Sequence, residues 1–255
     1  MFHGAAGIGK STTMGQVAET LAGDGARAVW IGLSADDRGD DRFWRHVLTT
    51  VSAAGLATES TLLAGLRDGG FVDRAQFGAI GAELAAIGEP IVIAFDDFHL
   101  AATPSIEDGL IELLAAAHNV TALVATRSPG RLTAPGARAR IPIASVTGDD
   151  LTFTREQTRA LVALRLPGLR EDEIDAVAAA VHDEARGWAL ATMALIEAPG
   201  DAPANPPVSA RSRANARVFV RDHVDRMLHS ATPNERDLLL RTSLIEEISP
   251  AIAMR

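Results

Sequence analysis

The 255-residue chain contains no cysteine. This absence excludes disulfide bonds, thiolate catalysis and sulfur-ligated zinc. The seven histidines include no pair at the spacing of metal ligands, which argues against a histidine-based zinc site. A cysteine-free chain is compatible with a reducing compartment, so we expect a cytoplasmic protein.

Basic residues and long apolar runs are also scarce. The chain has 24 Lys and Arg against 33 Asp and Glu, for a net charge of −9. Contacts with phosphates of nucleic acids or lipids need clustered Lys and Arg, so this balance disfavours direct DNA binding and membrane binding. No run of about 18 apolar residues could span a bilayer, and the amino terminus does not resemble a signal peptide. We therefore expect a soluble intracellular protein.

A phosphate-binding pattern is present near the start of the chain. Residues 4–11, GAAGIGKS, fit G-x-x-x-x-G-K-[ST] and directly precede a helical pattern. Lys10 would place its charge on the β- and γ-phosphates, and Ser11 would offer a hydroxyl to Mg²⁺. The start of the helix near Lys10 would point its positive end at the anion. The sequence therefore predicts a site for ATP or ADP with Mg²⁺. The expected nucleotide-binding residues are Gly4, Ala5, Ala6, Gly7, Ile8, Gly9, Lys10, Ser11 and Thr12.

The pattern of elements in residues 1–149 is typical of an α/β nucleotide-binding domain. Short apolar runs alternate with helical patterns, which indicates a doubly wound parallel sheet of the P-loop NTPase type. We predict strands at 28–33 and 91–95, both buried on two faces, a third at 120–125, and an edge strand at 140–143. Only three residues precede Gly4, whereas a strand usually has about five or more, so the first strand is expected to be short.

Beyond residue 149 the patterns are helical. Residues 150–198 are expected to form a small helical domain, and a capping box at Thr154 and Gln157 opens its first helix. Residues 199–212 begin with a Pro- and Gly-rich stretch and are expected to be a linker. Two further helical patterns in residues 213–255 indicate a third, incomplete domain. The arginines of residues 211–226 are interrupted by acids, which favours a solvated helix over a DNA contact.

Two acids follow the predicted strand at 91–95. The carboxyl end of a parallel strand is where ligands bind in such sheets, so we expect Asp96 to hold Mg²⁺ together with Ser11. Asp97 would orient or deprotonate the water that attacks the γ-phosphate. The alternative is a turn in which the two acids cap the following helix. His99 is interpreted as a loop histidine, or alternatively as a partner of the acids.

A cation follows the next predicted strand. Arg127 is placed to sense the γ-phosphate and to stabilise the charge of the transition state, although a solvated surface arginine is an equal alternative. The expected catalytic residues are therefore Lys10, Asp97 and Arg127.

Several segments resemble the STAND-class ATPases of MalT-like, large LuxR-type transcriptional regulators. The segment FDDFHL at 95–100 is similar to the LDDYHL segment of that family, and DDRFWRHVL at 40–48 is similar to its acidic loop and RFW helix. The shorter matches are TRS at 126–128, DLTFT at 150–154, GWA at 187–189 and LLLRTSL at 238–244. Nearly the whole chain is covered by these similarities.

The resemblance implies an ATP-binding, slowly hydrolysing switch of the AAA/STAND type, lacking a DNA-binding output domain in this chain. It implies that residues 213–255 are the start of a winged-helix module. It also implies self-association in the ATP state and control by an inducer or protein partner, neither of which the sequence names. Two alternatives stay open: a general AAA-type ATPase, and a truncated chain whose short first strand permits weak or no nucleotide binding.

Overall fold

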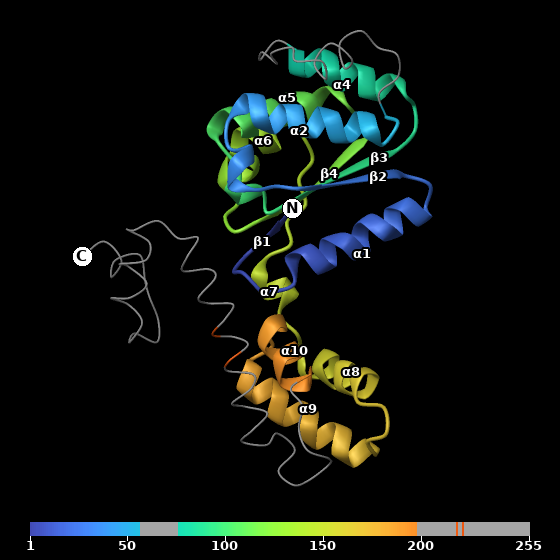
Figure 1. The fold of residues 1–255 in the computed structure, drawn as a ribbon, viewed down its shortest axis with the longest axis vertical. Helices are drawn as coiled ribbons and strands as arrows, with labels where there is room; N and C mark the ends of the chain where they lie inside the picture. Colours follow the sequence, from blue (N-terminus) through green and yellow to red (C-terminus); the bar gives the residue numbers. More distant parts are fainter. Residues whose placement is uncertain (57–75, 198–217, 219–220, 222–255) are drawn as a thin grey trace, which may run out of the picture. The chain divides into compact units, whose positions relative to one another are not determined.

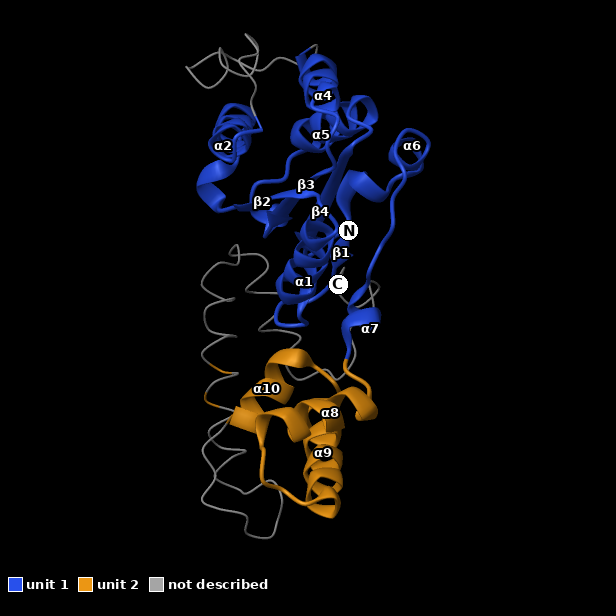
Figure 2. Cartoon of the chain, turned by 90° about the vertical axis from the view of Figure 1, so that its right-hand side faces the viewer, with its two compact units in different colours: residues 1–152 blue, residues 153–255 orange. Residues whose placement is uncertain are grey.

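The computed structural model describes residues 1–56, 76–197, 218 and 221. Figure 1 shows the course of the chain, and Figure 2 shows its two compact units, Met1–Thr152 and Phe153–Arg255. The expected linker at 199–212 and the expected winged-helix module at 213–255 lie outside the described residues, apart from Val218 and Arg221.

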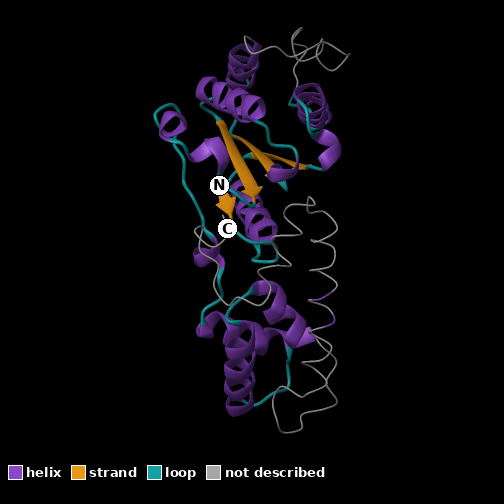
Figure 3. Cartoon of the chain, turned by 90° about the vertical axis from the view of Figure 1, so that its left-hand side faces the viewer, coloured by secondary structure: helices purple, strands orange, loops and turns teal. Residues whose placement is uncertain are grey.

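The described part of the first unit contains a parallel sheet of four strands (Figure 3). The strand order is β1-β4-β3-β2, and every neighbouring pair is parallel. The strand bounds are Phe2–His3 for β1, Arg27–Gly32 for β2, Ile91–Asp96 for β3 and Val120–Thr126 for β4. The predicted parallel α/β fold is therefore confirmed, and β1 is as short as expected.

Helices cover both faces of this sheet (Figure 1). On one face, α1 (Lys10–Gly23) packs Met14 and Ala18 against the sheet. On the other face, α2 (Asp40–Ala53), α4 (Gln76–Ala86) and α5 (Pro104–Ala116) enclose the larger core. Burial of such apolar side chains is the main favourable term in folding. The sheet is thus doubly wound, as the alternation of patterns predicted.

Strand β2 differs from its prediction. Its burial alternates, with Val29 and Ile31 buried and Trp30 43% exposed, whereas residues 91–95 of β3 are buried throughout. The reason is position, because β2 is the last strand in the order and β3 is central. The expectation that residues 28–33 are buried on both faces is therefore wrong.

The prediction of an edge strand at 140–143 is also wrong. These residues follow the short elements η3 (Gly130–Thr133) and α6 (Pro135–Arg138) as an irregular segment. The pairing occurs later instead, where Val146 forms a single parallel bridge with Phe2. Pro142 has no N–H to donate to a sheet ladder, which disfavours a strand centred on it.

Short elements connect the sheet to its helices. η1 (Ala35–Asp37) follows β2, η2 (Phe98–Leu100) follows β3, and α7 (Gly148–Leu151) is the last element of the first unit.

Within the described ranges, no helix combines the length and the apolar character that crossing a membrane requires.

The described part of the second unit is helical. It comprises α8 (Arg155–Arg165), α9 (Glu171–Ala185) and α10 (Ala189–Glu197). The predicted capping box is present, because the Thr154 hydroxyl accepts the Gln157 amide N–H while the Gln157 side chain accepts the Thr154 amide N–H. Buried Val162, Ile174 and Val181 form the centre of the core between these helices.

The contact between α4 and α5 predicts opposite effects for two glycine substitutions in one helix. A Cβ at Gly81 would lie 2.5 Å from the Leu113 carbonyl oxygen, so Gly81→Ala should reduce the free energy of unfolding by about 1–3 kcal/mol. A Cβ at Gly78 has nothing within 4 Å, so Gly78→Ala should be neutral or stabilising by up to about 1 kcal/mol. Urea unfolding of both variants tests this. Equal effects would contradict the close packing at Gly81.

Candidate nucleotide-binding site

The glycine-rich segment forms a tight loop between β1 and α1. Gly9 has a φ of 100° and stands immediately before α1, a conformation that side chains rarely adopt. Gly4 has a φ of 153°, and a Cβ there would lie 3.0 Å from the Gly148 Cα atom. The side chain of Ile8 is buried and anchors the loop to the protein. Gly4, Gly7 and Gly9 all have positive φ, so the backbone of this loop depends on glycine.

Lys10 is the only lysine of the chain, and it is buried. Its Nζ atom donates a hydrogen bond of 2.8 Å to the carbonyl oxygen of Ala5, inside the loop. Burial lowers the pKa of Lys10, Arg127 lowers it further, and the carboxylates of Asp97 and Asp96 oppose this effect. The lysine is thus held by the loop itself, within the electrostatic reach of two acids and a second cation.

Ser11 and Asp96 come together across 85 residues of sequence. The Ser11 hydroxyl donates a hydrogen bond of 2.7 Å to Asp96 Oδ1, at the end of β3. Mg²⁺ sites beside phosphates use one or two protein oxygens together with water and phosphate, and this pair of oxygens fits that requirement. In the described ranges no cluster of three or more His, Cys, Asp or Glu side chains could hold a metal ion. The described residues therefore offer this pair rather than a ligand-rich metal centre.

Asp97 has a strained backbone and an exposed carboxylate. Its φ of 52° lies in the left-handed region, which is uncommon for residues other than glycine and is often found at functional sites. The side chain is 59% exposed and makes no capping hydrogen bond to η2, and α5 is capped by Thr103 instead. The side chain of Asp97 therefore does not act as the helix cap considered above.

The burial of His99 is a feature that the sequence interpretation did not predict, although a place beside the acids was one of its two alternatives. Both ring nitrogens are buried without a hydrogen-bond partner among the described residues, and Nδ1 lies 3.9 Å from Asp97 Oδ1. Burial lowers the pKa of His99, as do Arg127 and Lys10, whereas Asp97 and Asp96 raise it. A neutral imidazole therefore lies beside the two acids. A histidine two residues after an acid gives no sequence signal of this burial.

Arg127 follows β4 as expected and is exposed. The positive charge of Arg127 lowers the pKa of both Lys10 and His99, so Arg127 belongs to the same cluster. The structure thus brings together Lys10, Ser11, Asp96, Asp97 and Arg127, all of which the sequence predicted for the site. Gly148, whose Cα atom limits the space beside Gly4, was not predicted, because no motif marks it.

Comparison with solved structures defines the class of fold. The ORC2 protein of Aeropyrum pernix, solved in ADPNP–ADP complexes, matches with a TM-score of 0.58 and 14% identity, covering 100% of this chain and 71% of that chain. The ORC1 protein of the same organism, solved in complex with DNA, matches with a TM-score of 0.54 and 18% identity over 96% and 65% of the two chains. The chain therefore shares the α/β fold of these ORC proteins.

Comparison with curated sequences finds similarity to regulators of one kind. The chain is 26% identical to the HTH-type transcriptional regulator MalT of Cronobacter sakazakii and 25% identical to that of Klebsiella pneumoniae strain 342. Each match covers 98% of this chain but only 27% of the relative, so the chain spans about a quarter of their length. No protein-family model matches. The resemblance to MalT-like regulators inferred from the motifs is confirmed.

The buried His99 predicts a loss of stability in mild acid. Because its pKa is lowered in the folded chain, the unfolded chain takes up a proton first as the pH falls through the ordinary histidine value of about 6.5. Stability contributed by neutral His99 is therefore present above that value and is lost as the pH falls toward the folded pKa. His99→Gln should reduce the difference in unfolding free energy between about pH 7.5 and about pH 5.5.

The matched control for this measurement is His118→Gln, which removes an exposed histidine outside the site. It should retain the pH dependence of the original chain in urea unfolding. An unchanged pH dependence in His99→Gln would contradict the assignment of a neutral imidazole at this position.

Proposed function

We propose that the chain is the ATP-binding, slowly hydrolysing switch domain of a MalT-like, LuxR-type STAND regulator that acts in the cytoplasm. The observation that carries this proposal is the hydrogen bond between Ser11 and Asp96, which joins the phosphate-binding loop to the acid at the end of β3. In this proposal residues 1–149 are the nucleotide-binding domain and residues 150–198 the helical domain.

Binding would use the loop and the start of α1. Backbone N–H groups of residues 4–9 and the amino-terminal end of α1 would surround the phosphates of ATP or ADP. Lys10 would exchange its bond to the Ala5 carbonyl for a phosphate oxygen, gaining a charged partner. Ser11 and Asp96 would hold Mg²⁺, which when bound neutralises charge on the phosphates.

Hydrolysis would depend on two exposed side chains. Asp97 would orient or deprotonate the attacking water, and Arg127 would stabilise negative charge in the transition state. Because both groups are exposed, their charges act through a high dielectric, which weakens transition-state stabilisation. This exposure supports slow hydrolysis, as in a switch that stays in its ATP-bound state for a long time, rather than rapid turnover.

The functional output would be conformational. We propose that the bound nucleotide changes the packing of the helical unit on the nucleotide-binding unit, and that the ATP state favours self-association. An inducer or protein partner would set the balance between the states. The support comes from the similarity to MalT regulators and from the division of the chain into two compact units.

A general AAA-type ATPase that acts on nucleic acid or a protein client is the second candidate. It is favoured by the likeness of the fold to the ORC proteins, one of which is solved with DNA. The net charge of −9 weighs against a nucleic-acid client. Rapid ATP turnover stimulated by DNA would favour this candidate over the switch.

Calorimetric titration with ATP and Mg²⁺ tests the proposal. Lys10→Ala should weaken ATP binding at least about tenfold, because loss of a hydrogen bond to a charged group costs about 1.5–3 kcal/mol. Asp97→Asn is the matched control within the site. It should keep ATP affinity but slow hydrolysis by roughly a hundredfold or more, since only the step that uses the carboxylate is lost.

An exposed cation outside the loop provides a second control. Arg138→Ala removes one positive charge from α6 and should leave ATP affinity unchanged. Equal affinity in a folded Lys10→Ala variant and in the original chain would contradict the proposed phosphate site. If Lys10→Ala and Arg138→Ala weakened ATP binding equally, the loss would reflect the change in net charge rather than a contact made by Lys10.

A further inference from the structure

Glu107 is a buried acid that the site described above does not use. It lies in the first turn of α5, and it is the one Asp or Glu that is buried among the described residues, with 7% of its surface exposed. A buried carboxylate is costly unless hydrogen-bond donors surround it. The donors that contact Glu107 therefore indicate what this side chain holds in place.

The donors are backbone amides of η3, the short helical turn that follows β4. The Arg131 N–H donates a hydrogen bond of 2.9 Å to Glu107 Oε1, and the Leu132 N–H also donates to this carboxylate. The first amides of a helical turn have no acceptor within the turn itself. Pro129, which precedes η3, makes no side-chain hydrogen bond that would cap it. Glu107 therefore caps η3 from a different helix.

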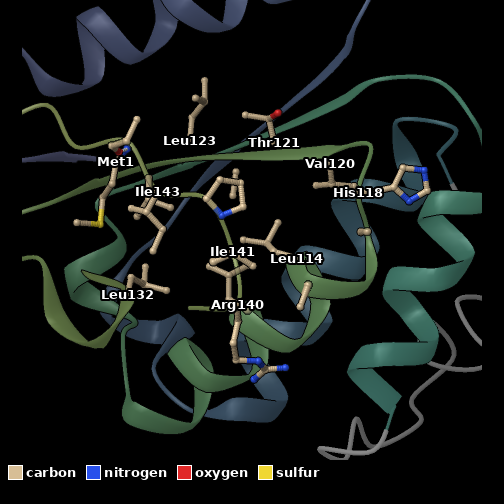
Figure 4. Close-up of a pocket in the computed structure, with 17 residues that line it drawn as sticks. Met1, Leu114, His118, Val120, Thr121, Leu123, Leu132, Arg140, Ile141 and Ile143 are labelled. Atoms are coloured by element: carbon tan, nitrogen blue, oxygen red, sulfur yellow. Dashed lines mark hydrogen bonds between the residues drawn. The ribbon is translucent and has the colours of Figure 1, made fainter. Parts of the chain in front are cut away.

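The start of η3 is fitted closely to this carboxylate. Gly130 has a φ of 55°, in the left-handed region, and a Cβ at this position would clash with Glu107 Oε1. Two residues later, the side chain of Leu132 is buried and lines an apolar cavity together with Ile141 and Ile143 (Figure 4). The carboxylate and the buried leucine thus anchor η3 to the protein.

The segment fixed in this way carries Arg127. Only Ser128 and Pro129 separate Arg127 from η3, and the ring of Pro129 restricts its φ, which is −69°. On the other side of Arg127, the buried Thr126 ends β4, and its hydroxyl donates to the Ser128 carbonyl oxygen at 2.9 Å. The backbone at Arg127 is therefore held by β4 before it and by Glu107 after it.

The energetics of Glu107 fit a role in fixing this geometry. Burial raises the pKa of Glu107, and the amides of Arg131 and Leu132 oppose this effect without cancelling it. A buried charge of this kind adds little stability compared with an apolar side chain of similar size. A catalytic cation, by contrast, depends strongly on exact placement.

We propose that Glu107 is a positioning residue for ATP hydrolysis, which holds the segment after β4 so that Arg127 is presented to the γ-phosphate. The inference rests on the proposed function, because it takes from it the role of Arg127 in the transition state. Glu107 acts through the backbone of residues 127–132 and needs no contact with the nucleotide. Its loss should therefore slow hydrolysis without weakening the binding of ATP.

Steady-state hydrolysis and calorimetric binding of ATP by the full chain test this role. Glu107→Ala should lower kcat by roughly tenfold or more and leave the Kd for ATP within about twofold. It should also speed hydrogen exchange of the Arg131 and Leu132 amides by roughly tenfold or more, because both lose their acceptor. Glu107→Gln keeps one carbonyl oxygen as an acceptor and should give an intermediate kcat. A purely structural role would change stability without this separation of kcat from Kd.

Matched variants separate this contact from its surroundings. Asp108→Asn removes the same charge from the next residue of α5, which pairs with the Arg131 side chain at 3.2 Å, and should leave kcat unchanged. Gly130→Ala pushes against the carboxylate from the other side and should lower kcat as Glu107→Ala does. Gly136→Ala is its control, because a Cβ there has nothing within 4 Å, and it should leave kcat unchanged.

A double-mutant cycle shows whether Glu107 acts through Arg127. Circular dichroism first establishes that each variant is folded at the assay temperature, and Glu107→Gln replaces Glu107→Ala in the cycle if the alanine variant is not. Adding the Glu107 substitution to Arg127→Ala should slow hydrolysis no further than Arg127→Ala alone.

Two patterns of results would overturn the inference, and they differ in what they say of the proposed function. Independent, multiplicative losses of kcat in the double variant, or a normal kcat in Glu107→Ala beside a slow Arg127→Ala, would overturn the positioning role alone. An unchanged kcat in Arg127→Ala would contradict the catalytic role of Arg127 in the proposed function, and the inference would fall with it.

Discussion

The hydrogen bond between Ser11 and Asp96 is the contact on which the organisation of the site depends. It fixes the first turn of α1 against the end of β3, although the two residues are 85 positions apart. The parallel register makes this possible, because β3 and β4 run side by side and end at the same edge of the sheet. Without that register, the loop, the acids and Arg127 would be separate surface features.

The sequence predicted which side chains the structure brings together around Lys10, because its signals are local. Spacing within residues 4–11 defines the loop, and two acids after an apolar run define the end of β3. The failures concern features that depend on strand order and packing. Trp30 is exposed because β2 is at the edge, and His99 is buried by elements distant in sequence. The close approach of Gly148 to Gly4 likewise follows from tertiary contact alone.

The site contains two positive and two negative side chains. Lys10 and Arg127 face Asp96 and Asp97, and Lys10 is satisfied within its own loop by a carbonyl oxygen. A bound phosphate would replace that neutral partner with a charged one, whereas Mg²⁺ would take up the negative charge of Asp96.

The most direct measurement uses the fact that Lys10 is the only lysine. An amine-selective reagent can then modify only Lys10 and the amino group of Met1, and the ratio of the two rates is read by mass spectrometry. We expect ATP with Mg²⁺ to slow modification of Lys10 by roughly tenfold or more and to leave the modification rate of Met1 unchanged, because a bound phosphate would cover the lysine amine. An unchanged rate at Lys10 with saturating ATP and Mg²⁺ in a folded chain would contradict the account.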